Sequence, residues 1–238
     1  MKNSLVFLFT VICFLNFGQT SHSTWNELLV KYVSNDGKVD YLGFKNESVK
    51  LDKYLALLQN NGPESNWSME EKIAYWANAY NAFTIKLILK NYPLKSITEI
   101  KINNQNAWDY KWIKIGKETM SLNDIEHNKL RGQFNDARIH FVLNCASYSC
   151  PILLNEALTS KDLDIQLENQ TVKFINDPLR NSISSANIQV SQLFNWYKSD
   201  FTSDGKSLIE FINQYAKIKV SKTAKISYLE YNWKLNSK

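Results

Sequence analysis

The sequence has few of the side chains that carry out covalent chemistry. Its 238 residues include only three His and three Cys. It contains no glycine-rich phosphate loop and no HExxH pair of zinc ligands, and it shows no internal repeat or low-complexity linker. These absences argue against a P-loop nucleotide site, a zinc protease of the HExxH type and a repeat architecture. No motif suggests a cofactor, so none is expected.

A concentrated basic surface is also missing from the sequence. The net charge is +5, but the Lys residues are spread over many segments, with no basic run and no Arg-rich stripe. A nucleic-acid groove normally needs such a concentration of positive charge. Nucleic acid is therefore not an expected partner, and the sequence names no other.

The chain has no apolar run long enough to cross a membrane, but it begins like an exported protein. Lys2 precedes an apolar run that ends at Leu15, and small polar residues follow from Gly18. A transmembrane helix needs about 20 residues, so this pattern predicts a cleaved secretory signal peptide over residues 1–20. We expect a single domain over residues 21–238, located in the periplasm or outside the cell, with no transmembrane anchor. Paired cysteines in those compartments form disulfides by default.

The apolar pattern predicts an α+β fold that is rich in helix. The most apolar helix follows the capping box of Ser68 and Glu71 and runs to about Leu89. It is apolar on every side, so we expect it to be central, buried and packed on a small, mostly antiparallel sheet. Further helices are expected near the N-terminus and in the C-terminal half, at 24–32, 51–58, 163–175 and 208–215, and strands within 97–115 and 181–190.

The central helix carries polar residues on a face that should be buried. Asn78 and Asn81 lie three residues apart and therefore share that face. A buried amide without hydrogen-bond partners costs about 1–3 kcal/mol. Both side chains should thus bind loop backbone or belong to a ligand site.

Nearly all the reactive side chains fall between Ser121 and Pro151. His22 and Cys13 lie near the N-terminus. The segment contains every other His and Cys together with charged neighbours: His127, His140, Cys145, Cys150, Glu126, Arg131 and Arg138. Such a concentration locates a candidate site, although it does not name a reaction.

The first part of this segment should be a short helix. Ser121 and Asp124 can cap it, and Glu126 lies on its apolar stripe, so the carboxylate should point inward. An inward carboxylate needs a partner. The sequence leaves open a structural ion pair with Arg131 or Arg138, or a contact with His140 or a ligand.

The last part should be a strand followed by a helix. Residues 139–143 have the composition of a short strand, in which alternation places His140 and Cys145 on opposite faces. Pro151 is suited to the first position of a helix, expected over 152–158, with Cys150 as its N-cap. The helix dipole would lower the pKa of that thiol, which makes Cys150 the better nucleophile of the two.

Five ordered motifs resemble the domain of unknown function 547 family, and together they span nearly all of the chain after the signal peptide. They are AYWANAYNAF at 74–83, SLNDIEHNKLR at 121–131, RIHFVLNCASYSCP at 138–151, LFNWYKSDF at 193–201 and YNWKLN at 231–236. The family has no established activity. The resemblance therefore implies which residues matter and supplies no catalytic roles.

Three functions are consistent with these residues. The favoured one is an exported binding or scaffold domain whose pocket contains Cys and His, with a disulfide between Cys145 and Cys150. The alternative is a thiol-dependent hydrolase or acyltransferase with Cys150 as nucleophile and His140 as base. A second alternative is a zinc site made by both histidines and both cysteines of the segment. The catalytic candidates are Cys150, His140, Glu126 and Cys145, and the ligand-binding candidates are Asn78, Asn81, His127, Asn144 and Arg131.

Overall fold

The computed structural model describes residues 20–238 of the chain. The expected signal peptide falls almost wholly on residues 1–19, outside the described part. The architecture is the mixed, helix-rich α+β type that the apolar pattern predicted. Within residues 20–238, no helix has both the length and the apolar character that crossing a bilayer requires.

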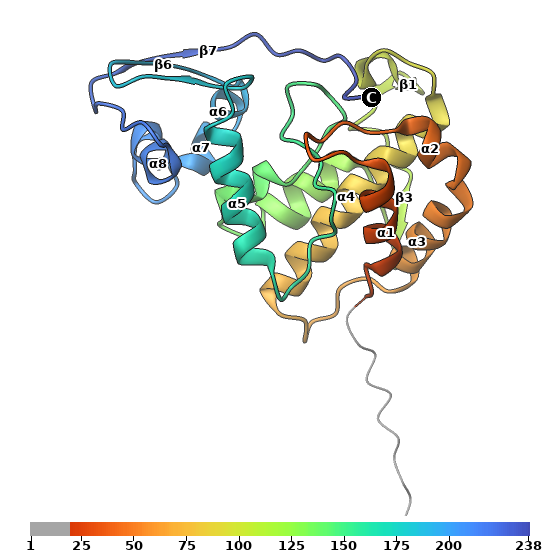
Figure 1. Cartoon of the computed structure of the whole chain (residues 1–238). Helices are drawn as coiled ribbons and strands as arrows, with labels where there is room; N and C mark the ends of the chain where they lie inside the picture. Colours follow the sequence, from red (N-terminus) through yellow and green to blue (C-terminus); the bar gives the residue numbers. More distant parts are fainter. Residues whose placement is uncertain (1–19) are drawn as a thin grey trace, which may run out of the picture.

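A long helix, α4 (Met69–Asn91), lies at the centre of the molecule (Figure 1). It begins at the predicted capping box, in which Ser68 Oγ accepts from Glu71 N–H and Glu71 accepts from Ser68 N–H. Every residue from Ile73 to Ile85 is buried, as expected for a helix that is apolar on all sides. It packs against the N-terminal helices α2 (Tyr41–Asn46) and α3 (Ser48–Asn60), and α1 (Ser23–Tyr32) packs on α2 and α3.

The strands form three small sheets. β1 (Lys101–Ile102) pairs with β2 (Gln105–Asn106), and β3 (Ile113–Ile115) pairs with β4 (Glu118–Met120), both antiparallel. In the third sheet, β6 (Asn187–Val190) pairs antiparallel with β5 (Ser182–Ile183) and parallel with β7 (Lys225–Tyr228). Pairing is therefore mostly antiparallel, but it is divided over separate sheets because each strand is only two to four residues long.

The buried apolar residues form two clusters. The larger surrounds α1 to α4. The smaller is rich in Phe and lies among β6, α5 (Leu163–Ile175), α6 (Leu193–Trp196), α7 (Lys198–Phe201) and α8 (Leu208–Tyr215). Ile139 and Val142 belong to the first cluster and Phe141 to the second. The segment that carries His140 therefore lies where the two clusters meet.

The expected strand over 139–143 does not form. Residues Ala137–Phe141 are a 3₁₀ helix, η3, whose N-cap Asp136 accepts a hydrogen bond from Arg138 N–H. The β-branched residues of this segment are buried by packing on neighbouring helices, chiefly α5. Tertiary contact thus overrides the local strand preference. The alternation argument that separated His140 from Cys145 fails with it.

The expected helix over 152–158 is also wrong, because this segment is irregular. Its backbone N–H and carbonyl groups form hydrogen bonds with side chains of other segments and not with one another. Leu158 is bound through both its N–H and its carbonyl by Asn78, and Ala157 N–H donates to Asn26 Oδ1. Cys150 is consequently not the N-cap of a helix, and no helix dipole acts on its thiol.

After β7 the chain runs back across the molecule to end near β1 (Figure 1). On the way it lies along the segment after Cys145. Tyr148 N–H donates to the carbonyl of Lys234, and Asn236 N–H donates to that of Ala146. This return brings Tyr231 and Trp233 to the reactive residues, almost ninety positions away in the sequence.

Candidate functional site

A pocket of about 300 Å³ lies at the junction of the two apolar clusters. Glu126, His140, Cys145 and Cys150 all line it. They come from the π-helix η2 (Asp124–Arg131), from η3 and from the turn that follows η3. The structure therefore brings the four catalytic candidates together, although the elements that carry them differ from those expected.

A strained turn presents Cys145. The next residue, Ala146, has φ of +63°, a left-handed conformation that residues other than Gly rarely adopt. Asn144 Oδ1 accepts from Ala146 N–H at 3.0 Å, and Asn81 Oδ1 accepts from Asn144 N–H at 2.8 Å. Such strain persists only where the surroundings hold it, and it is concentrated at functional sites.

Cys145 and Cys150 are free thiols, so the expected disulfide is absent. Their sulfur atoms lie 2.8 Å apart, whereas a disulfide bond is about 2.05 Å long. Cys145 Sγ also lies 3.2 Å from Ser147 Oγ and 3.4 Å from the hydroxyl of Tyr231. In the neutral pair the Cys145 thiol donates to Cys150 Sγ, and Ser147 Oγ donates to the hydroxyl of Tyr231 at 2.9 Å. When Cys145 ionises, these three neighbours become its potential donors.

The two thiols differ in acidity, in the order opposite to that expected from the sequence. A hydrogen bond from Cys150 to the Cys145 thiolate, helped by Ser147 and Tyr231 and opposed by burial, lowers the pKa of Cys145 to about 7. Burial raises the pKa of the Cys150 thiol well above its ordinary value, and the neighbouring Cys145 raises it further. Cys150 is 5% exposed. Cys145 is thus the better nucleophile.

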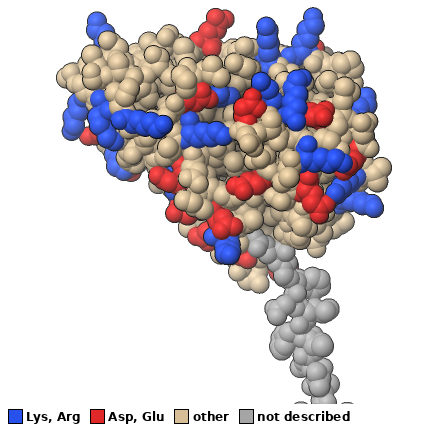
Figure 2. All heavy atoms as spheres, viewed as in Figure 1, with Lys and Arg blue, Asp and Glu red and all other residues tan. Residues whose placement is uncertain are grey.

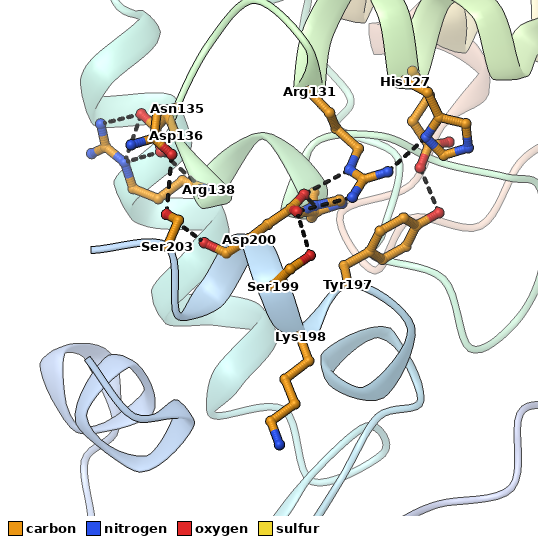
Figure 3. A network of polar contacts seen from close by, with 12 residues as sticks. His127, Arg131, Asn135, Asp136, Arg138, Tyr197, Lys198, Ser199, Asp200 and Ser203 are labelled. Carbon is orange, nitrogen blue, oxygen red and sulfur yellow. Dashed lines mark hydrogen bonds and ion pairs between the residues drawn. The ribbon is translucent and has the colours of Figure 1, made fainter. Parts of the chain in front are cut away.

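His140 is held by a hydrogen bond to an acidic residue that the sequence did not suggest. Its Nε2 lies 2.8 Å from Oδ2 of Asp200, which also binds Arg131 through two hydrogen bonds of 2.6 and 2.9 Å. Figure 3 shows Arg131 and His127 beside Asp200 and Tyr197 in this network. Burial by itself would raise the pKa of Asp200, but the hydrogen bonds from His140 and Arg131 outweigh burial and hold that pKa well below its usual range.

Tyr197 lies beside Arg131 and His127 at one side of this network (Figure 3). Its ring packs against that of His140 with the centroids 4.2 Å apart and the planes tilted by 32°, and the Arg131 guanidinium lies 4.7 Å from the ring centroid. Its hydroxyl donates to Glu126 Oε1 at 2.6 Å. The partner of the inward carboxylate is therefore Tyr197, since Arg131 binds Asp200 and Arg138 binds Asp136.

The ligand-binding candidates lie mostly behind the pocket. Asn78 and Asn81 are interior and hydrogen-bonded as expected, and both amides bind loop backbone. Asn144 is buried and binds the carbonyl of Pro151. His127 Nδ1 lies 2.8 Å from Arg131 Nη1, four residues further along the same helix. These five side chains support the turn and the network, and none of them lines the pocket.

The described residues do not form the zinc site. No group of three or more His, Cys, Asp and Glu side chains among residues 20–238 is placed to hold a metal ion. His127 Nδ1 contacts Arg131 and His140 Nε2 contacts Asp200, so these two nitrogens are already engaged by other side chains.

Sequence reasoning missed Asp200, Tyr197 and Tyr231. The first two lie in LFNWYKSDF and the third in YNWKLN, motifs that carried the family resemblance but had no assigned chemistry. Asp200 and Tyr197 are three residues apart, a spacing that places two side chains on one helical face. That spacing was the available signal, whereas nothing local indicated contact with Cys145 or His140.

Comparison with known proteins yields a family and nothing more specific. Residues 64–175 match the family described as "Protein of unknown function, DUF547". The matched region includes the first three of the five motifs and ends before LFNWYKSDF and YNWKLN. No curated protein and no solved structure matches the chain. Through residues 64–175, which carry the Cys, His and Glu side chains of the pocket, the chain belongs to the DUF547 family.

Proposed function

We propose that the pocket catalyses thiol-dependent acyl transfer, as a hydrolase or an acyltransferase, with Cys145 as the nucleophile. The observation that carries this proposal is the environment of Cys145. Its thiol sits on a strained turn, among three potential hydrogen-bond donors, and it opens into a pocket that also contains an imidazole oriented by a carboxylate. A thiol that shares a site with an imidazole oriented by a third side chain is the arrangement used by Cys-His enzymes.

His140 supports the role of general base. Ionised Asp200 can only accept a hydrogen bond, so the proton of neutral His140 lies on Nε2 and leaves Nδ1 as an acceptor. Nδ1 has no hydrogen-bond partner among residues 20–238. It is not fully enclosed, because the enclosed side-chain atoms without a partner in this part of the chain are His22 Nε2 and Trp112 Nε1. His140 is 3% exposed, and the surface it retains includes part of the pocket wall. His140 lines the same pocket as Cys145, so a bound substrate can lie between them.

The proposed reaction follows from these positions. His140 takes the thiol proton, and Cys145 Sγ forms a bond to the carbonyl carbon of an acyl substrate. The bond to the leaving alcohol or amine breaks, and that group takes the proton from His140. Water then attacks the thioester carbonyl as His140 takes one of its protons. The bond between that carbon and Cys145 Sγ breaks, the carboxylic acid leaves, and His140 returns the proton to the sulfur; an acceptor alcohol or amine can replace water in the same step.

The scaffold function is supported less well, because the disulfide on which it depended is absent. A pocket lined by Cys and His is present, and any enzyme must also bind its substrate there. Two free thiols 2.8 Å apart, with the pKa of Cys145 lowered and that of Cys150 raised, are not needed to hold a purely structural loop. The geometry therefore favours catalysis.

Acyl turnover tests the proposal directly. With p-nitrophenyl acetate, the protein is expected to release nitrophenol continuously, and Cys145→Ala should abolish this release. His140→Gln keeps the nucleophile but removes the base, so hydrolysis of the thioester should slow by about 10²- to 10⁴-fold. Acetylated Cys145 should then accumulate and be visible by intact-protein mass spectrometry.

Cys150→Ser is the matched control for this experiment, because it changes the neighbouring sulfur and keeps a donor beside Cys145. It should retain turnover. Release that persists unchanged in Cys145→Ala, or a His140→Gln protein that turns over like the wild type, would exclude the proposed chemistry.

We also propose that the chain is exported, on the basis of the apolar run behind Lys2. Thr20 Oγ1 donates to the carbonyl of Asn61 at 2.8 Å, and His22 Nδ1 lies 2.7 Å from the hydroxyl of Tyr54. Cleavage before Thr20 would preserve both contacts. Mass spectrometry of protein from its native host should find an N-terminus between Gly18 and Thr24, and an intact Met1 would contradict export.

A further inference from the structure

One wall of the pocket is made of aromatic rings that touch each other. Trp196, Tyr231 and Trp233 form a continuous group with centroid separations of 4.5 to 5.9 Å, and Trp108 packs on Trp233 at 5.6 Å. All four line the pocket. Aromatic faces attract organic cations within about 6 Å, and Trp is the most effective of them.

A carboxylate with an unused oxygen faces the same pocket. Glu126 is 6% exposed and belongs to no ion pair among the described residues. Its Oε1 accepts from Tyr197, whereas Oε2 has no partner among residues 20–238. Oε2 is not one of the enclosed unpaired atoms, which are His22 Nε2 and Trp112 Nε1. Since Glu126 lines the pocket, this oxygen is available to whatever binds there.

The pocket contains no positive side chain to neutralise Glu126. None of its lining residues is Lys or Arg, although the chain has a net charge of +5 and Lys and Arg are abundant on the face seen in Figure 2. The closest guanidinium in the network, Arg131, is already paired with Asp200 through two hydrogen bonds. A buried carboxylate without a cation is costly, and a positively charged ligand would remove that cost.

We propose that the pocket selects an acyl substrate that carries an organic cation, an alkylammonium or quaternary ammonium group, placed against the Trp and Tyr wall and Glu126. This assignment of substrate class rests on the proposed acyl-transfer function. Anionic substrates are disfavoured because Glu126 and the Cys145 thiolate would repel them. Tyr80 also lines the pocket and is 2% exposed. Its hydroxyl has no hydrogen-bond partner among residues 20–238 and can donate to a carbonyl oxygen of the substrate.

A matched pair of esters tests the assignment. The acetate ester of choline and 3,3-dimethylbutyl acetate have nearly the same shape and differ in charge. Their binding to the Cys145→Ala protein, which cannot react with them, can be measured by calorimetry. The cationic ester is expected to bind about tenfold more tightly or better. Glu126→Gln should remove most of this preference, and Trp233→Leu should weaken binding of the cation.

Equal binding of the two esters, tighter binding of the neutral one, or no binding of either would overturn the cation assignment. Failure of the acyl-transfer proposal is distinguishable from this. In that case Cys145→Ala would still prefer the cation by the same factor, while the unmodified protein would bind the choline ester without hydrolysing it. Circular dichroism of each variant, compared with the parent, identifies any loss of binding that follows from loss of fold, and Glu126→Asp then serves as the replacement that keeps the charge.

Discussion

Replacement of Asn81 by Leu is expected to lower the free energy of unfolding by about 2–5 kcal/mol. Asn81 is 5% exposed, and its amide binds two backbone groups, the carbonyl of Val142 and the N–H of Asn144. Leu fills a similar volume but leaves both groups buried without partners. Since Asn144 in turn holds Ala146 in its left-handed conformation, the substitution should also release the turn that presents Cys145. Urea denaturation and thiol alkylation would measure the two effects.

Asn78→Leu provides the matched control one helical turn earlier. Like Asn81, Asn78 binds one backbone carbonyl and one backbone N–H, both belonging to Leu158, but the segment around Leu158 does not present the thiol. We expect a comparable loss of stability with no change in the reactivity of Cys145. If Asn81→Leu left both stability and reactivity unchanged, the turn would not depend on α4. If both variants altered reactivity equally, the effect would come from general loosening of the fold.

The rate at which iodoacetamide alkylates Cys145 is expected to rise with pH around a midpoint near 7. The hydrogen bond from Cys150 is the largest cause of the lowered pKa, with Ser147 and Tyr231 adding to it. A lowered pKa means that the reactive thiolate is present above that pH and is lost as the pH falls through it. Cys150 should remain unlabelled over the same range, because burial raises its pKa and only 5% of it is exposed. Peptide mapping after short labelling would assign the modified residue.

Two substitutions of Cys150 separate the hydrogen bond from the packing. Cys150→Ala removes the donor and should raise the midpoint by about one pH unit or more, toward that of an ordinary thiol near 8.5. Cys150→Ser retains a hydroxyl donor and should keep most of the lowering. Equal midpoints in the Ala and Ser variants would show that Cys150 does not activate its neighbour. Preferential labelling of Cys150 in the unmodified protein would reverse the assigned roles.

The elements that could be predicted from the sequence are those stabilised by their own residues. The capping box at Ser68 begins α4 where expected, and the helix expected over 208–215 is α8. The apolar pattern located α3 and α5, and the strands expected within 181–190 are β5 and β6. In each case the signal is a cap, a turn or a periodicity within a few residues, and the structure uses that same local interaction.

The segment between η3 and α5 could not be predicted, because its backbone bonds to distant side chains. Asn78 and Asn81 reach it across 80 and 61–63 positions, and Arg180 Nε donates to the carbonyl of Cys150. Local propensity favoured a strand at 139–143 and a helix after Pro151, but the long-range hydrogen bonds replace those of regular structure. That error reversed the expected order of the two thiols, since it removed the helix that was to activate Cys150.

For this chain, the sequence by itself determined the helix-rich class, the buried central helix with its interior Asn residues, and the segment in which the reactive side chains lie. Scarcity was sufficient for the last of these, because few His and Cys residues exist outside it. The tertiary structure alone decided which of the two thiols has the lowered pKa and that Asp200 orients His140. It also decided that Tyr197 donates a hydrogen bond to Glu126 and that Tyr231 and Trp233 complete the pocket. These decisions depend on contacts between segments sixty to ninety residues apart, in which hydrogen bonding and burial act through space and leave no local pattern along the chain.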